Sequence, residues 1–149
     1  MIKVLKFGGT SVGSAANMKK VAEIVRREQA RITVLSAMSG TTDSLVRISR
    51  AAASGDRNAI EEQLAMLTDK YTRCIEELLR ERKQQALARM NATFGLIRDE
   101  AAAFEEYESE RKIIAQGELL TSAIFTAYLQ ETGLKAECLY SPDFMVKDP

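Results

Sequence analysis

The stretch from Lys6 to Ser14, Lys-Phe-Gly-Gly-Thr-Ser-Val-Gly-Ser, holds the residues best suited to chemistry. Adjacent glycines, Gly8 and Gly9, allow a ligand to approach the backbone closely and point successive N–H groups into one concavity. A helix that begins after Ser14 would add the partial positive charge of its N-terminus. Together these features predict a site for a phosphate-sized anion.

This turn differs from the named phosphate-binding motifs. Gly8 and Gly13 have the spacing of a Walker A loop, but Ser14 stands where that motif has Lys, and Rossmann glycines are not adjacent. The cation instead precedes the glycines, as Lys6 at the end of an apolar stretch. Its ammonium group could neutralise a transferring phosphoryl group. Alternatively, Lys6 is an ordinary lysine that extends from a strand end into solvent.

A second polar turn covers residues 36–43, Ser-Ala-Met-Ser-Gly-Thr-Thr-Asp, and follows another apolar stretch. If both stretches are parallel strands, both turns lie at their carboxyl ends, where open sheets bind ligands. The hydroxyl groups of the second turn belong to Ser36, Ser39, Thr41 and Thr42. They could donate hydrogen bonds to a carboxylate or a phosphate, or simply cap the next helix.

Glu118 is the third candidate. The residues one helical turn away are Ile114, Ala115, Thr121, Ser122 and Phe125. This pattern places a carboxylate on a mostly apolar helix face beside two hydroxyls, where it would need a cationic partner such as a substrate ammonium group. The alternative is an ordinary Glu near a helix start. Gly117 would let a backbone or a ligand approach closely.

Two short apolar stretches, residues 2–7 and 31–35, are predicted strands. A helix between them is predicted from a potential N-cap at Ser14. Its apolar face would carry Met18, Val21, Ala22 and Val25. The order strand, Gly-rich turn, helix, strand predicts a βαβ unit with parallel strands.

From residue 44 to 130 the chain is rich in helix-forming residues. We predict four helices, at about 43–53, 58–82, 84–106 and 110–132, with weaker breaks near 91–95 and 107–109. The middle pair is strongly charged, which predicts two antiparallel helices whose charged residues face solvent.

Gly133 is predicted to end the last helix as its C′ residue. Residues 135–140 form a predicted third strand, and a turn follows at residues 141–143. The predicted fold is therefore α/β, with a partial, mainly parallel sheet, a large helical portion and an uncovered sheet edge.

The chain has 149 residues, 21 basic and 21 acidic side chains, and no His. A balanced charge gives no field that would attract nucleic acid or anionic lipid. The missing His excludes Ser-His-Asp and Cys-His nucleophiles from this chain. Cys74 and Cys138 are too few for a disulfide framework and are predicted to be buried thiols of a reducing compartment. No stretch approaches the ~18 apolar residues of a membrane helix, so we expect a cytoplasmic protein.

Three motifs resemble those of aspartate kinases. Residues 6–12, Lys-Phe-Gly-Gly-Thr-Ser-Val, resemble the opening signature of that family, and residues 34–43, Val-Leu-Ser-Ala-Met-Ser-Gly-Thr-Thr-Asp, resemble its second loop. Residues 116–122, Gln-Gly-Glu-Leu-Leu-Thr-Ser, resemble its Gly-Glu helix. The opening motif is the most specific, because other amino-acid kinases usually share only a shorter Lys-x-Gly-Gly core.

The resemblance implies an amino-acid-kinase three-layer sandwich that transfers the γ-phosphoryl group of ATP to the side-chain carboxylate of L-aspartate, on the route to lysine, threonine and methionine. Mg²⁺ would be held by the ATP phosphates. Lys6 would be catalytic, Ser36 and Thr42 would lie at the substrate, and Glu118 would hold the aspartate ammonium group. The residues implied to line the phosphate path are Lys6, Gly8, Gly9, Thr10 and Ser11.

Aspartate kinases continue into a second half that carries a catalytic Asp and the adenine pocket, and then into ACT domains. The resemblance therefore implies that residues 1–149 are the N-terminal, aspartate-binding part, with a helical excursion at about 58–106, inactive alone and homo-oligomeric in the intact enzyme. Residues 141–149 match the family only loosely, with Asp143 where an Arg is expected.

Two alternatives stay open. The first is another amino-acid kinase, acting on glutamate, acetylglutamate or a nucleotide, although residues 10–12 and Glu118 argue against it. The second is a non-catalytic interaction module that binds through its helices at residues 58–106. Neither alternative calls for nucleic acid or a membrane.

Overall fold

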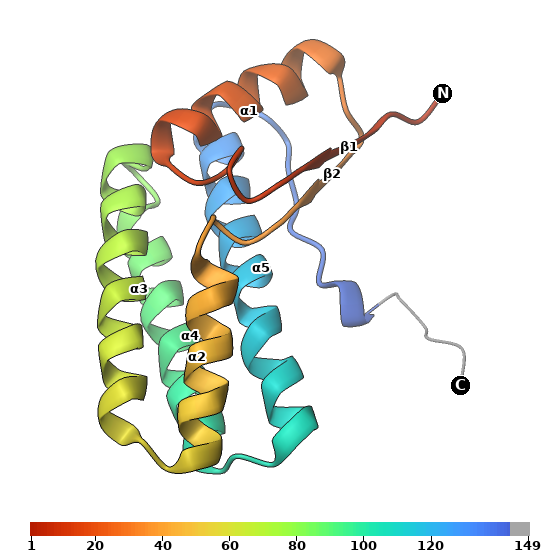
Figure 1. Ribbon diagram of the computed structural model, residues 1–149. Coiled ribbons are helices and arrows are strands. Elements are labelled where there is room, and N and C mark those ends of the chain that lie inside the picture. Colours follow the sequence, from red (N-terminus) through yellow and green to blue (C-terminus); the bar gives the residue numbers. More distant parts are fainter. Residues whose placement is uncertain (144–149) are drawn as a thin grey trace.

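The computed structural model describes residues 1–143. Its elements are β1 (Val4–Phe7), α1 (Ala15–Glu28), β2 (Ile32–Leu35), α2 (Thr41–Ser54), α3 (Arg57–Leu78), α4 (Lys83–Ala102), α5 (Glu106–Glu131) and the short 3₁₀ helix η1 (Ser141–Asp143). Helices α2 to α5 run alternately up and down as a bundle, and β1, β2 and α1 lie together at one end of it (Figure 1). This confirms an α/β chain that is mostly helical.

The first three elements form the predicted βαβ unit. Strands β1 and β2 pair in parallel, in a register that runs from Val4↔Ile32 to Phe7↔Leu35. Helix α1 begins where predicted, because the Ser14 side chain accepts a hydrogen bond from the Asn17 N–H at 3.1 Å. Its buried residues include the four predicted for its apolar face. The predicted βαβ unit is thus confirmed.

The two faces of the β1–β2 sheet differ sharply. Along β1, Leu5 and Phe7 pack against the hydrophobic core, whereas Val4 and Lys6 are exposed. In β2, Leu35 is buried, while Ile32 and Val34 remain 47% and 44% exposed. Strand periodicity therefore places Lys6 on an outward face that is otherwise apolar.

The four helices of the bundle are all present, with shifted ends. Helix α3 is shorter than predicted because the chain leaves the helix at Leu79, which is itself buried. The Glu131 carboxylate then holds the connection, accepting hydrogen bonds from the backbone N–H groups of Arg80 and Arg82 at 3.0 and 2.5 Å. The charged helices α3 and α4 are antiparallel as predicted, but each also buries an apolar face against the rest of the bundle.

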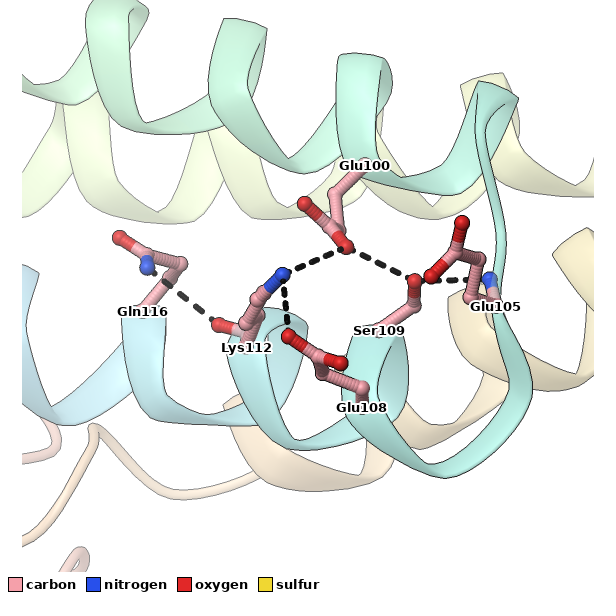
Figure 2. A network of polar contacts seen from close by, with 6 residues as sticks. All are labelled: Glu100, Glu105, Glu108, Ser109, Lys112 and Gln116. Atoms are coloured by element: carbon pink, nitrogen blue, oxygen red, sulfur yellow. Dashed lines mark hydrogen bonds and ion pairs between the residues drawn. The ribbon is translucent and has the colours of Figure 1, made fainter.

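The α4–α5 connection differs from the predicted break near residues 107–109. Helix α5 already begins at Glu106, because the buried Ser109 hydroxyl accepts a hydrogen bond from the Glu105 N–H at 2.9 Å and donates one to Glu100 at 2.7 Å. Lys112 adds ion pairs to Glu108 at 2.9 Å and Glu100 at 3.7 Å (Figure 2). The break predicted near residues 91–95 is wrong as well, since α4 continues through it with Phe94 in the core.

Two further predictions are wrong. Residues 135–140 do not form a strand: within the part of the chain that the structure describes, the sheet has only β1 and β2. A strand needs a neighbour to satisfy its backbone, and here Gln130 Nε2 instead donates to the Ala136 carbonyl at 2.8 Å. Cys138 lies in this extended segment and is exposed, whereas Cys74 is buried as predicted.

Gly133 ends α5 as predicted, with a φ of +85° and its N–H bonded to the Gln130 carbonyl at 3.1 Å. Most of the loosely matching stretch 141–149, from residue 144 onward, lies outside the described residues. Across residues 1–143, no helix has both the length and the apolar character to cross a membrane.

Candidate functional site

The first loop, residues 8–14, leaves the carboxyl end of β1 and folds back on itself before α1. The Thr10 carbonyl accepts hydrogen bonds from the Gly13 N–H at 3.2 Å and from Asn17 Nδ2 at 3.0 Å. A Cβ on Gly8 would meet nothing within 4 Å. The Gly8 backbone is therefore accessible from outside, as a phosphate-binding backbone must be.

The second loop, residues 36–40, packs directly on the first. The Ser39 N–H donates to the Gly9 carbonyl at 3.1 Å, and the Ser36 N–H donates to the Phe7 carbonyl at the same distance. A Cβ on Gly9 would lie 2.7 Å from the Ala37 carbonyl oxygen, which is closer than real Cβ atoms approach a backbone atom. Gly9 is thus required for this contact, and the predicted proximity of the two turns is confirmed.

A buried network of hydroxyl groups joins the second loop to the helical bundle. Thr121 of α5 accepts the Met38 N–H at 3.2 Å and bonds the Tyr71 hydroxyl at 3.0 Å. The same Tyr71 hydroxyl bonds the Thr41 hydroxyl at 3.1 Å, at the start of α2. Burial raises the pKa of Tyr71, so the phenol stays neutral. The loop is therefore held by α2, α3 and α5 together.

Gly117 allows α5 to pack closely against the second loop, as its sequence neighbourhood predicts. It is buried, and a Cβ at this position would lie 3.0 Å from Thr41 Cγ2 and 3.1 Å from Ala37 Cβ and Leu45 Cδ1. A larger side chain would push α5 away from the loop. The glycine of the Gly-Glu motif is thus required for the packing of α5.

The environment predicted for Glu118 is wrong. Its side chain is exposed, while Gly117 before it and Thr121 after it are buried. Arg111 and Ala115, two turns and one turn before Glu118, are exposed as well, so Glu118 lies on the solvent-facing side of α5. A carboxylate in water needs no buried cation. Glu118 nevertheless follows directly on the residue that contacts the second loop.

The remaining candidates lie at the same end of the bundle and are accessible to solvent. Lys6 is exposed one residue before the first loop turns, and Ser36 at the start of the second loop is half-buried. The other exposed candidates are Thr10, Ser11 and Thr42. Within residues 1–143, no hydrogen bond joins the side chain of Lys6 or Glu118 to either loop. The structure thus brings the loops together and leaves these charges open to solvent.

A cavity of about 430 Å³ lies between the two loops and α3. It is lined by Gly13, Ser14, Ala15, Met38, Met66, Asp69, Lys70, Arg73, Cys74 and Glu77. Lys70 Nζ donates to the Ser39 carbonyl, and burial lowers the pKa of Lys70. Burial also raises the pKa of Cys74 to about 11. Sequence analysis missed Lys70, whose only local signal is its position next to the buried Tyr71.

Comparison with known proteins agrees with the motifs. The model of the amino acid kinase family matches residues 1–147. An aspartokinase of Chlamydia muridarum is 30% identical over 97% of this chain, and aspartokinase 1 (chloroplastic) of Arabidopsis thaliana is 32% identical over 89% of it. These alignments cover 31% and 24% of the relatives, so the chain spans less than a third of their length.

Solved structures show the same relation. Aspartokinase III of Escherichia coli in complex with aspartate and ADP superposes with a TM-score of 0.78 and 26% identity, over 92% of this chain and 30% of the other. An aspartate kinase of Clostridium acetobutylicum shares the fold with a TM-score of 0.72, over 87% of this chain and 29% of the other. The resemblance to aspartate kinases predicted from the sequence is confirmed.

Proposed function

The chain belongs to the amino acid kinase family, and from this premise we propose that it is the aspartate-binding part of an aspartate kinase. In the proposed reaction, a side-chain carboxylate oxygen of L-aspartate attacks the γ-phosphorus of ATP. The bond from that phosphorus to the oxygen bridging it to the β-phosphate breaks, so the products are 4-phospho-L-aspartate and ADP. The relatives named aspartokinase, one of them solved with aspartate and ADP, support this proposal.

The observation that carries the proposal is the contact between the two loops. The Ser39 N–H to Gly9 carbonyl hydrogen bond fixes a glycine-rich loop beside a hydroxyl-rich one, at the carboxyl ends of two parallel strands. The first loop offers backbone donors suited to phosphate, and the second offers hydroxyls suited to a carboxylate. A phosphoryl donor and a carboxylate acceptor could thus be aligned across one short distance.

In this proposal each candidate residue has a stated role. Lys6 neutralises the negative charge of the transferring phosphoryl group, along a path lined by Gly8, Gly9, Thr10 and Ser11. Ser36 and Thr42 meet the aspartate carboxylate, and Glu118 pairs with its ammonium group. The exposure of Glu118 suits this role, since a substrate must reach it from solvent. The acceptor is already an anion at neutral pH, so the step needs no general base.

The proposed reaction includes Mg²⁺ as a partner of ATP. In the part of the chain that the structure describes, no three His, Cys, Asp or Glu side chains are grouped so that they could hold a metal ion. We therefore propose that the ion is held by the ATP phosphates, where it shields their charge. Homo-oligomerisation, a cytoplasmic location and a place in lysine, threonine and methionine biosynthesis stay predictions from the family.

The substrate is tested with the complete polypeptide that contains this chain. ATP is supplied with L-aspartate, L-glutamate or N-acetylglutamate. Hydroxylamine traps the acyl phosphate as a hydroxamate, which is measured as its coloured complex with ferric ion. We expect aspartate to be preferred over glutamate by at least about tenfold, since one methylene group discriminates by that order. Preference for glutamate or acetylglutamate would identify a different amino-acid kinase.

The isolated chain provides a second test. It should bind L-aspartate, and a ligand at about 100 times its dissociation constant stabilises the folded state by ~2.7 kcal/mol. Thermal unfolding should therefore shift upward with aspartate, and less so in Glu118→Gln. The same chain should show no turnover with ATP and aspartate. A rate within about tenfold of the complete polypeptide would contradict the proposal that this chain is only the aspartate-binding part of the enzyme.

A further inference from the structure

Helix α3 places two consecutive side chains, Lys70 and Tyr71, against the second loop. Lys70 Nζ donates to the Ser39 carbonyl and lies 3.6 Å from where a Cβ on Gly40 would be. The Lys70 residue is half-buried, and this burial lowers its pKa. Partial removal of water from a cation costs free energy. The charge-assisted hydrogen bond from Lys70 to the loop offsets this cost.

Tyr71 holds the neighbouring part of the loop. Its hydroxyl lies between those of Thr41 and Thr121, at 3.1 and 3.0 Å, and Thr121 in turn accepts the Met38 N–H. Met38, Ser39 and Thr41 are thus each tied to the helical bundle. Lys70 supplies the only one of these ties that carries charge.

The position of the second loop determines two parts of the proposed site. The Ser39 whose carbonyl binds Lys70 also donates its N–H to the Gly9 carbonyl at 3.1 Å. On its other side the loop continues through Gly40, with a φ of +80°, into the first turn of α2, where Thr42 lies. A shift of Ser39 therefore moves both the glycine loop and Thr42.

We propose that Lys70 is a positioning residue for phosphoryl transfer, which holds the Ser39 carbonyl and thereby sets the distance between the glycine loop and Thr42. This inference rests on the proposed function of the two loops. Lys70 acts through the backbone of the second loop and does not touch the substrate itself. Because Lys70 lies on α3, the helical bundle would help to position the two loops for the reaction.

The first test measures the loop itself, by hydrogen exchange of backbone amides in the 149-residue chain. Lys70→Met should speed exchange in residues 36–42 by at least about fivefold, the order expected when one charged hydrogen bond to a local structure is lost. Lys70→Arg should restore most of the protection, and Lys20→Met, on the exposed face of α1, should change nothing. Unchanged exchange in residues 36–42, or faster exchange spread over all helices, overturns the proposal.

The second test separates positioning from general stability, using kinetics of the complete polypeptide. Lys70→Met should lower kcat by about tenfold, because donor and acceptor are no longer aligned, while the KM values for aspartate and ATP change less than threefold, and Lys70→Arg should recover most of the wild-type kcat. A wild-type kcat in Lys70→Met overturns the proposal. If the wild-type protein phosphorylates no aspartate, the proposed function fails, and the exchange experiment still decides whether Lys70 holds the loop.

Discussion

The two ends of the helical bundle are built from different interactions. At the end that carries the loops, Tyr71, Thr41 and Thr121 form a buried, uncharged network. Gly9 and Gly117 allow close packing at this end. At the far end, the α4–α5 connection is held by the exposed carboxylate of Glu108 and the half-buried one of Glu100, both paired with Lys112 (Figure 2). The buried Ser109 hydroxyl also bonds Glu100.

The loop end is built to hold one exact arrangement of its groups, whereas the far end contributes to general stability. Buried hydroxyl groups with several partners accept only one arrangement, because each unmade hydrogen bond costs free energy. Exposed ion pairs tolerate many arrangements, since solvent replaces them. The loop end is therefore expected to be sensitive to small changes in shape, and the far end to be tolerant of changes in charge.

The largest effect is expected from Gly9→Ala. The new Cβ would meet the Ala37 carbonyl oxygen at 2.7 Å and the Ser39 nitrogen at 3.3 Å, so backbone must move. We expect a loss of about 1–3 kcal/mol in the free energy of unfolding, as for other overpacked sites. Urea denaturation measures it. Gly8→Ala is the matched control, because its Cβ meets nothing within 4 Å, and equal losses in both variants would refute the close contact.

Tyr71→Phe should have the next largest effect. It removes the hydroxyl shared by Thr41 and Thr121 while keeping the ring, which packs edge-on against Phe94. We expect a loss of about 1–2 kcal/mol, since two buried partners each lose a hydrogen bond. Urea denaturation measures this loss. Tyr107→Phe is the matched control, because Tyr107 is 70% exposed and lies outside the buried network. A loss in Tyr107→Phe as large as in Tyr71→Phe would show that burial is irrelevant here.

Ser109→Ala tests the far end by the same method. Its hydroxyl serves the Glu105 N–H and the Glu100 carboxylate, so its removal should cost about 1 kcal/mol of stability. Aspartate binding, followed by the shift in thermal unfolding, should stay unchanged, because the substitution lies at the other end of the bundle. Loss of aspartate binding in Ser109→Ala, at temperatures where the variant is folded, would contradict the separation of the two ends.

The smallest effect concerns pH. Glu61 and Arg98 form a two-pronged ion pair at 2.6 and 2.9 Å, and the hydrogen bond from Arg98 lowers the pKa of Glu61 below its ordinary value of 4.5. A lowered folded-state pKa stabilises the fold above pH 4.5, and this contribution is lost as the pH falls below that value. The pair is exposed, so Glu61→Gln should cost only a few tenths of a kcal/mol at pH 7.

The test compares wild type and Glu61→Gln by thermal unfolding at pH 7 and pH 3. The two melting temperatures should differ slightly at pH 7 and converge at pH 3. A difference that grows toward pH 3 would have the wrong sign for a carboxylate with a lowered pKa.

Local signals predicted the parts of the fold that depend on neighbours in the chain. The Ser14 cap, the parallel strands and the Gly133 helix end all follow from such patterns. The proximity of the two loops followed as well, because parallel strands bring their carboxyl ends together.

What sequence analysis missed depends on contacts between distant residues. Lys70 belongs to a helix predicted to face solvent, and its partner Ser39 lies 31 residues away. The exposure of Glu118 depends on which side of α5 packs against the second loop, and only the structure shows that this side is the one that carries Gly117. The predicted third strand failed for the same reason, since β propensity does not supply a neighbouring strand.

If the chemistry lies at the loop end, removing a cation there should affect the reaction far more than removing one at the far end. In the complete polypeptide, kcat for aspartyl phosphate formation is compared for Lys6→Met, at the loop end, and Lys112→Met, at the far end. We predict that Lys6→Met lowers kcat at least about 100-fold, by removing charge stabilisation from the transition state, while Lys112→Met stays close to wild type. Wild-type kcat in Lys6→Met, or an equal loss in Lys112→Met, would contradict the account.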